Sequence, residues 1–289
     1  MSSISYLNGI FLPASEARIS PLDRGFIFGD GIYEVIPAYG SQLFRLDEHL
    51  QRLDDNLAEV RIKQPLTNNE WKTVLSEVVA RNQAAHGGEQ SIYLQVTRGV
   101  AERDHGFPDS NVEPTLFIMS APLKPLPASI TEEGVAAITH EDIRWKNCHI
   151  KSTSLLGNIL LRQHAYDEDA VEAILVRDGE VTEGAASNLF AIIDDVLITP
   201  PKGPLLLPGI TRDLILELAK QHNIAACEAF ITPAQLSDAE EIWLTSSTKE
   251  ILPVTTLNGN AVNDGKPGKV WQQMTQHYQA YKQQLRNTS

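Results

Sequence analysis

A proline-rich stretch at residues 121–127 splits this sequence into two halves. It reads Ala-Pro-Leu-Lys-Pro-Leu-Pro, with three prolines in seven residues. Because proline lacks a backbone N–H and pushes the preceding residue towards an extended conformation, such a run suits neither a helix interior nor a central strand. The chain has 289 residues and is 42% hydrophobic, which is enough for two cores. We therefore predict domains at residues 1–120 and 128–289, joined by an interdomain linker at 121–127.

Charge and cysteine content disfavour several classes of protein. The net charge is −13 at pH 7, which disfavours nucleic acid and anionic membranes as partners. No apolar run approaches the roughly 18 residues of a membrane span, and Met1–Tyr6 lacks the basic start and apolar core of a signal peptide. Cys148 and Cys227 have no metal-type spacing and are expected to be free thiols. We expect a cytoplasmic protein without a metal site.

Hydrophobic periodicity predicts helices and strands on both sides of the linker. Apolar residues recur at helical spacing in residues 46–61, 69–85, 211–221 and 269–285. Strand patterns bounded by turn residues occupy residues 5–7, 10–12, 91–97, 115–120, 173–176, 180–182, 188–193 and 196–199. The second half is therefore richer in sheet, and we expect its meander of short strands to pair antiparallel.

Lys151 lies where a strand pattern meets a helix pattern. Residues 143–151 alternate in the manner of a strand that ends at Lys151. Residues 154–166 carry apolar side chains at helical intervals, and a residue among 152–154 could serve as the N-cap. Functional residues collect where a strand end leads into a helix. Most lysines in such places are nevertheless solvated loop residues, so the position alone does not decide the role.

A carboxylate follows Lys151 about one strand pair later, at Glu183 in the segment Val181–Asn188. A lysine amine can form an imine with a carbonyl group. A carboxylate can keep a pyridine nitrogen protonated so that the ring accepts carbanion electrons. Lys151 and Glu183 together therefore suggest an enzyme with an aldehyde cofactor. Cys148, close to Lys151 in sequence, is interpreted as a packing residue.

Two segments could bind the phosphate of such a cofactor. Pro208–Arg212 directly precedes a helical pattern, and the exposed N–H groups at the start of a helix suit an anion. Residues 244–250 place four hydroxyl side chains after an apolar strand. Taken alone, each segment is weak evidence, because an ordinary capped turn has the same composition.

Two glycine-containing loops could bind a substrate. Arg103 and His105, two residues apart, could converge on one carboxylate, although most exposed pairs of this kind are merely solvated. Gly29 and Gly31 predict tight turns that bring the backbone close to another group, and Tyr33 could present its hydroxyl to a ligand. A buried core tyrosine is the competing interpretation.

The order of these segments resembles that of the fold-type IV pyridoxal-phosphate enzymes, the family of D-amino-acid transaminases, branched-chain transaminases and aminodeoxychorismate lyase. The resemblance implies an α+β fold, with a small α/β N-terminal domain and a larger, sheet-rich, barrel-like C-terminal domain. It also implies pyridoxal 5′-phosphate as the cofactor. The matching blocks, between about Tyr6 and Gly268, are Asp23–Glu34, Glu48–Leu53, Gln95–Pro108, Ile143–Asn158, Val181–Phe190, Gly209–Asp213 and Leu244–Pro253.

The resemblance also assigns roles to single residues. The residues implied at the cofactor are Lys151 as the Schiff-base lysine, Glu183 at the pyridine nitrogen, and Arg52, Ile210, Thr211 and Ser247 at the phosphate. Two departures from the usual pattern are Ala185-Ala186 in place of serines and Ser247 in place of threonine. They affect details of cofactor hydrogen bonding and not the identity of the cofactor.

Among the branches of the family, D-amino-acid transaminase fits best, because Tyr33, Arg103 and His105 match that branch's binding site for the substrate α-carboxylate. In that branch the loop with Arg103 and His105 reaches the neighbouring subunit's site, so a homodimer is implied. We expect an enzyme that transfers the amino group of a D-amino acid, such as D-alanine, to a 2-oxo acid, such as 2-oxoglutarate. The alternatives are aminodeoxychorismate lyase, a branched-chain or (R)-amine transaminase, and a ligand-binding protein without turnover.

Overall fold

The computed structural model describes residues 3–287 of the chain. Met1 and Ser2, which belong to the segment considered above as a signal sequence, lie outside the described residues. The chain divides into two compact units, and the main division between Lys124 and Pro125 falls within the stretch predicted as a linker. The division is not a single cut, because short segments from later in the chain join the first unit.

One of these segments is Ile150–Leu155, which carries Lys151. It belongs to the first unit, although the residues on both sides of it, up to His149 and from Leu156, belong to the second. Residues 284–287 are also part of the first unit. The two units are described separately below.

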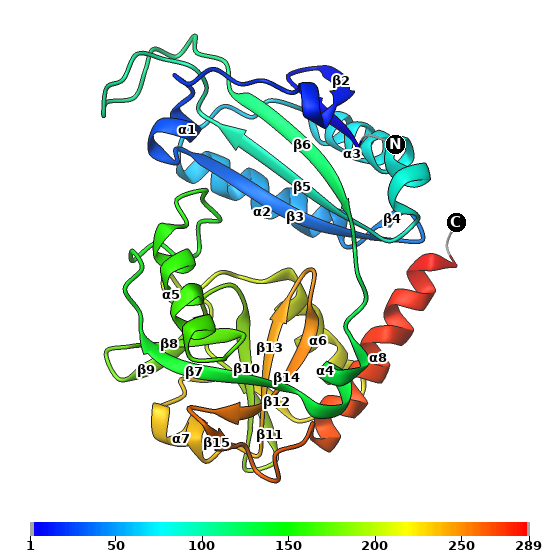
Figure 1. Ribbon diagram of the computed structural model, residues 1–289, viewed down its shortest axis with the longest axis vertical. Helices are drawn as coiled ribbons and strands as arrows, with labels where there is room; N and C mark the ends of the chain where they lie inside the picture. Colours follow the sequence, from blue (N-terminus) through cyan, green and yellow to red (C-terminus); the bar gives the residue numbers. More distant parts are fainter. Residues whose placement is uncertain (1–2, 288–289) are drawn as a thin grey trace. The chain divides into compact units, whose positions relative to one another are not determined.

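The first unit is an antiparallel sheet against which helices α2 and α3 pack (Figure 1). The strand order is β2-β1-β6-β5-β3-β4. The core between the sheet and these helices is aliphatic apart from Tyr6 and Trp71. The elements are β1 (Ile4–Leu7), β2 (Ile10–Pro13), a 3-10 turn (Ala14–Glu16), α1 (Arg24–Phe28), β3 (Gly31–Tyr39), β4 (Gln42–Leu43), α2 (Leu46–Glu59), α3 (Asn68–His86), β5 (Gln90–Thr97) and β6 (Thr115–Pro122).

Local sequence signals account for both helices of the first unit. In α2 the apolar stripe that includes Leu53 and Leu57 is buried against the sheet. α3 begins with a capping box, in which the Thr67 hydroxyl accepts the N–H of Glu70 and the Glu70 carboxylate accepts the N–H of Thr67 at 2.7 Å. The predicted helices at 46–61 and 69–85 are confirmed to within two residues at either end.

The second unit is a curled mixed sheet with helices around it (Figure 1). The strand order is β12-β11-β10-β13-β14-β7-β8-β9, with β15 paired to β14. The antiparallel pairing predicted for the meander is confirmed for β8 with β9 and for β10 with β11, whereas β7 pairs parallel with both β8 and β14. The elements are α4 (Ala128–Glu133), β7 (Val135–Glu141), α5 (Leu156–Asp167), β8 (Glu172–Arg177), β9 (Glu180–Gly184), β10 (Asn188–Ile193), β11 (Val196–Thr199), α6 (Ile210–Gln221), β12 (Ala226–Glu228), α7 (Pro233–Ser237), β13 (Glu241–Ser246), β14 (Glu250–Leu257), β15 (Asn260–Ala261) and α8 (Lys269–Arg286), whose last turn belongs to the first unit.

The strand predicted at residues 143–151 is wrong, because this segment is irregular and forms part of no strand in the described part of the chain. Side-chain hydrogen bonds, and not the backbone hydrogen bonds of a sheet, fix this segment. Asp142 accepts hydrogen bonds from the backbone N–H and the guanidinium of Arg144, and Arg177 donates to the carbonyl oxygens of Asp142 and Arg144. The alternation in the sequence therefore reflects side chains with ionic partners and not two faces of a sheet.

The state of the two cysteines agrees with the prediction from the sequence. Cys148 is buried, Cys227 is exposed, and both are free thiols as predicted. The Cys148 thiol donates to the carbonyl oxygen of Trp145 at 3.0 Å, which agrees with a packing role. In the described part of the chain, no helix is long and apolar enough to cross a membrane.

Candidate active site

In the first unit, Lys151 is held alongside the start of β3. The N–H of Tyr33 donates to the carbonyl oxygen of Lys151 at 3.0 Å, and the N–H of Thr153 donates to that of Gly31 at 2.9 Å. The N–H of Lys151 itself donates to Oδ1 of Asn56 at 2.7 Å. The Lys151 Nζ atom lies 4.3 Å from the centroid of the Tyr33 ring. The backbone of the candidate lysine is thus fixed on both sides, while its amine lies over an aromatic face.

The predicted close approach of backbone at Gly29 and Gly31 is confirmed, and the group approached is the Lys151 segment. Gly29 has φ +67°, and a Cβ there would lie 2.6 Å from Oγ of Ser154. The Thr153 hydroxyl donates to the carbonyl oxygen of Gly29 at 2.8 Å. Only glycine fits this turn, because other residues would be strained at that φ and would collide with the segment.

Arg52 lies in a buried ionic cluster in which Glu34 is the central residue. Nε and one terminal nitrogen of Arg52 donate to the two Glu34 carboxylate oxygens at 2.7 and 2.8 Å, and Nδ1 of His49 lies 2.8 Å from Oε2. Burial alone would raise the pKa of Glu34, but the charges of Arg52 and His49 hold it well below its usual range. Burial lowers the pKa of His49, against the opposing effect of Glu34.

Three further residues at this site, Glu34, His49 and Asn56, were not predicted from the sequence. Glu34 is on β3 next to Tyr33, and His49 precedes Arg52 by three residues on α2, so the helical spacing places those two on one face. That spacing was a usable signal. Nothing in the sequence pairs either residue with Glu34, because this contact joins a strand to a helix.

The structure brings Arg103 and His105 together at the side chain of Phe28. The Arg103 guanidinium carbon lies 5.4 Å from the Phe28 ring centroid, and the His105 ring is also 5.4 Å from it. Both side chains are exposed. Within residues 3–287 of one chain, no hydrogen bond or ring contact joins either of them to Tyr33, which stacks on Tyr93 instead.

In the second unit, Glu183 is a buried carboxylate with three hydrogen-bond donors. Oε1 accepts from Arg144 at 2.6 Å, and Oε2 accepts from the Asn188 amide at 3.0 Å and from the Leu207 N–H at 3.1 Å. Burial raises the pKa of Glu183 to about 7, although the Arg144 charge opposes this effect. The carboxylate therefore changes its protonation close to neutral pH, where a neighbouring cation would hold it ionised.

The N-terminus of α6 has the features of an anion site. Gly209 is the N-cap and offers no side-chain cap, so the first N–H groups of the helix have no partner within it. A Cβ on Gly209 would lie 1.9 Å from Oδ1 of Asn188. Thr211 is 2% exposed, and its hydroxyl has no hydrogen-bond partner among residues 3–287. Ser247 is partly buried in the turn that follows β13. Helix α6 packs against β13 itself.

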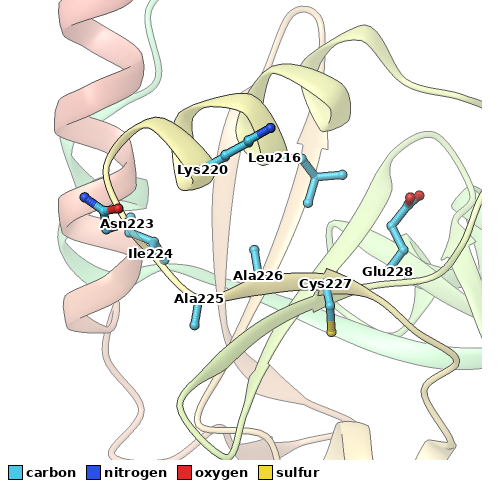
Figure 2. Close-up of a pocket in the computed structure, with 8 residues that line it drawn as sticks. All are labelled: Leu216, Lys220, Asn223, Ile224, Ala225, Ala226, Cys227 and Glu228. Carbon is cyan, nitrogen blue, oxygen red and sulfur yellow. The ribbon is translucent and has the colours of Figure 1, made fainter.

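A hollow of about 580 Å³ lies elsewhere in this unit, between the second half of α6 and the edge strand β12 (Figure 2). Lys220 and Glu228 are among its lining residues. None of the site residues predicted from the sequence lines it, and it is open rather than enclosed. We assign it no part in the site.

The comparison with protein families identifies the chain's relatives. The family model described as amino-transferase class IV matches residues 31–257. The chain belongs to this family. It is 41% identical to a D-alanine aminotransferase of Staphylococcus aureus (strain COL) over 276 residues, which are 96% of each chain.

Solved structures agree on the fold. The Escherichia coli branched-chain amino acid aminotransferase matches with a TM-score of 0.90 and 26% identity, covering 97% of this chain and 94% of that chain. The T.th. branched-chain amino acid aminotransferase with pyridoxamine 5′-phosphate matches with a TM-score of 0.90 and 25% identity, covering 98% and 94%. The predicted family and α+β fold class are confirmed.

The chain is therefore a transaminase that depends on pyridoxal 5′-phosphate, as the sequence analysis predicted. The residues present fit that cofactor. Thr211 has a buried hydroxyl without a partner at an uncapped helix N-terminus, which suits the phosphate. Glu183 is a carboxylate whose pKa of about 7 would fall beside a pyridinium cation.

Proposed function

We propose that this enzyme transfers the amino group of a D-amino acid, such as D-alanine, to a 2-oxo acid, such as 2-oxoglutarate. The observation that carries the proposal is the 41% identity over 96% of the chain to a protein named D-alanine aminotransferase. The branched-chain aminotransferases of similar fold are only 25–26% identical. The match to that branch's carboxylate-binding residues at Tyr33, Arg103 and His105 supports the same proposal.

In the proposed mechanism, Lys151 holds the cofactor and moves a proton. When bound, pyridoxal 5′-phosphate supplies a ring that accepts the electrons of the deprotonated substrate carbon. The Nζ atom of Lys151, as a free amine, would take the proton from the substrate α-carbon and deliver it to the C4′ carbon of the cofactor. Its fixed backbone, bonded to Tyr33 and Asn56, restricts where that amine can reach.

We propose that the Glu183 carboxylate accepts a hydrogen bond from the N–H of the cofactor ring, so that the ring stays cationic. For the phosphate, we propose Arg52, the N–H groups of Ile210 and Thr211, the Thr211 hydroxyl and Ser247. Glu34 already occupies two nitrogens of Arg52, so this arginine would bind the phosphate as a charge fixed in place by a buried carboxylate.

We propose that Tyr33, Arg103 and His105 bind the substrate α-carboxylate in a homodimer. Within one chain, Arg103 and His105 meet at Phe28 and not at Tyr33, which is what a loop serving a second copy requires. The exposed face of α5 supports self-association. Its residues Leu156, Ile159 and Leu160 are 69%, 60% and 54% exposed, an apolar cluster that a second subunit could cover.

We also propose residence in the cytoplasm. Two free thiols, one of them exposed at Cys227, are the usual state of cysteine in a reducing compartment.

Half-reaction spectra of the purified holoenzyme test the substrate class. We expect D-alanine to convert the cofactor absorbance to that of its aminated form, and 2-oxoglutarate to restore it, while L-leucine and an amine without a carboxylate react slowly or not at all. Faster conversion by L-leucine would contradict the proposal and indicate a branched-chain transaminase, which is the activity named for the two structural neighbours. Formation of pyruvate from aminodeoxychorismate without any 2-oxo acid would identify the lyase.

A further inference from the structure

Arg144 links the candidate carboxylate Glu183 to a second buried carboxylate, Asp142. Nε and one terminal nitrogen of Arg144 donate to the two Asp142 oxygens at 2.9 Å, and the other terminal nitrogen donates to Oε1 of Glu183 at 2.6 Å. The side chains of all three residues are at most 5% exposed. The guanidinium group therefore binds both carboxylates through three hydrogen bonds, and a further one goes to the carbonyl oxygen of Leu205 at 3.3 Å.

The cluster has two positive and two negative residues. Arg177 adds the second positive charge, at 3.1 Å from Oδ1 of Asp142, and makes no contact with Glu183 among the described residues. Cys148 is the remaining titratable group beside the cluster, and burial raises the pKa of its thiol to about 11, so it stays neutral. Arg144 is thus the one cation that touches Glu183 in the described part of the chain.

The two oxygens of Glu183 are used unequally. Oε2 accepts two hydrogen bonds, from Asn188 and Leu207, while Oε1 accepts one, from Arg144. An ionised carboxylate oxygen has two lone pairs. Oε1 therefore keeps acceptor capacity for one more donor beside Arg144.

We propose that Arg144 is a positioning residue that orients Glu183 to accept the N–H of the cofactor ring and favours its ionised form. The inference rests on the proposed role of Glu183. Burial favours the neutral acid, and Asp142 adds a negative charge nearby, so loss of the Arg144 guanidinium would raise the pKa of Glu183 above its value of about 7 and make the neutral acid predominate at neutral pH. A protonated Glu183 cannot hold a ring nitrogen in its cationic form.

The first test uses the protein without cofactor, so it does not depend on catalysis. The carboxyl groups of glutamate are labelled with ¹³C, the Glu183 signal is assigned by its loss in Glu183→Gln, and its pKa is read from a pH titration. We expect Arg144→Met to raise the pKa of Glu183 by at least about one unit, a tenfold change in proton affinity. Arg177→Met is the matched control, because it removes a charge from the same cluster without touching Glu183, and should leave that pKa in place.

The second test uses the holoenzyme loaded with pyridoxal 5′-phosphate labelled with ¹⁵N in the ring. We expect the ring nitrogen to be protonated at pH 7.5 in the parent and in Arg177→Met, and mostly neutral in Arg144→Met. An unmoved Glu183 pKa in Arg144→Met overturns the inference. A ring-nitrogen signal that is unchanged in Glu183→Gln overturns the proposed role of Glu183 instead, so the two failures are distinguishable.

Arg144→Lys covers the case in which the methionine variant does not fold. Lysine keeps the charge but has no planar fork, so it cannot bind Asp142 and Glu183 in the same way. We expect a Glu183 pKa between those of the parent and Arg144→Met, and a partly neutral ring nitrogen. A lysine variant with the parent pKa and the parent ring signal contradicts the proposal that the fork positions Glu183.

Discussion

The N–H of Tyr33 donates a hydrogen bond to the carbonyl oxygen of Lys151 at 3.0 Å. A residue predicted to bind the substrate carboxylate and the residue predicted to hold the cofactor are therefore joined through their backbones at the start of β3. The side chains follow the same relationship, with the Lys151 amine over the Tyr33 ring. A shift of β3 would move both groups together.

Lys151→Ala should abolish the half-reactions and leave the fold intact. General base catalysis alone contributes about 10²–10⁴-fold, and covalent attachment of the cofactor is lost as well. The hydrogen bonds that fix this segment involve the backbone of Lys151, which alanine keeps. Single-turnover spectra and thermal unfolding measure the two effects. Half-reactions at the parental rate would refute the assignment of Lys151.

Asn56→Ala should disturb the lysine without touching the cofactor. The Asn56 side chain accepts the Lys151 N–H at 2.7 Å and is buried, so its loss should cost about 1–3 kcal/mol of unfolding free energy. Asn82→Ala is the control, because Asn82 is also a buried amide but bonds Ser3, Ile4 and Val78 instead. We expect both variants to be less stable and only Asn56→Ala to lower kcat. Equal kcat values would contradict a role for Asn56 in placing Lys151.

Glu34→Gln should change how stability depends on pH. The folded pKa of Glu34 lies below its unfolded value, so the carboxylate stabilises the fold above the ordinary pKa of 4.5 and the contribution is lost as pH falls below it. With glutamine, this dependence should disappear. At pH 7 the variant should lose about 3 kcal/mol, since Arg52 stays buried without its charge partner. Denaturant unfolding between pH 3 and pH 7 provides the measurement, and parallel curves for the two proteins would disprove the ion pair's contribution.

Arg103→Ala should raise KM for amino acids and leave simple amines unaffected. Arg103 is exposed and lies against Phe28, so removing it should not alter the melting temperature. The loss of one charge-assisted contact to a carboxylate corresponds to about 1.5–3 kcal/mol, roughly a tenfold to hundredfold rise in KM. Steady-state kinetics with D-alanine and with a carboxylate-free amine separate the cases. An equal loss for both substrates argues against a carboxylate-binding role.

Gly209→Ala should weaken cofactor binding. The new Cβ would lie 1.9 Å from Oδ1 of Asn188, the residue whose amide holds Glu183, so Asn188 or the start of α6 must move. Overpacking of this kind costs about 1–3 kcal/mol, equivalent to roughly a tenfold weaker Kd or more. Gly203→Ala in the preceding loop is the control, because a Cβ there meets nothing within 4 Å. If both variants bind pyridoxal 5′-phosphate with the same Kd, the cradle at Gly209 is not a cofactor site.

Local patterns determined most of the regular elements. α2, α3 and α6 follow from apolar residues at helical spacing, and β10 and β11 from short apolar runs with turn residues between them. These signals are local, because a helix or strand buries one face whatever it packs against. The same reasoning failed at residues 143–151, where charged side chains have partners and imitate the alternation of a strand.

The sequence also predicted only part of the candidate site. Lys151 and Glu183 stood out in the sequence because of their chemistry, and the resemblance to a family supplied roles for Arg52, Thr211 and Ser247. Only the tertiary structure paired Glu34 with Arg52 and Arg144 with Glu183, and placed Lys151 in the first unit. The types and spacing of the residues show which charged groups the chain carries. The burial that shifts their pKa values and the partners that offset it exist only once distant segments have packed together.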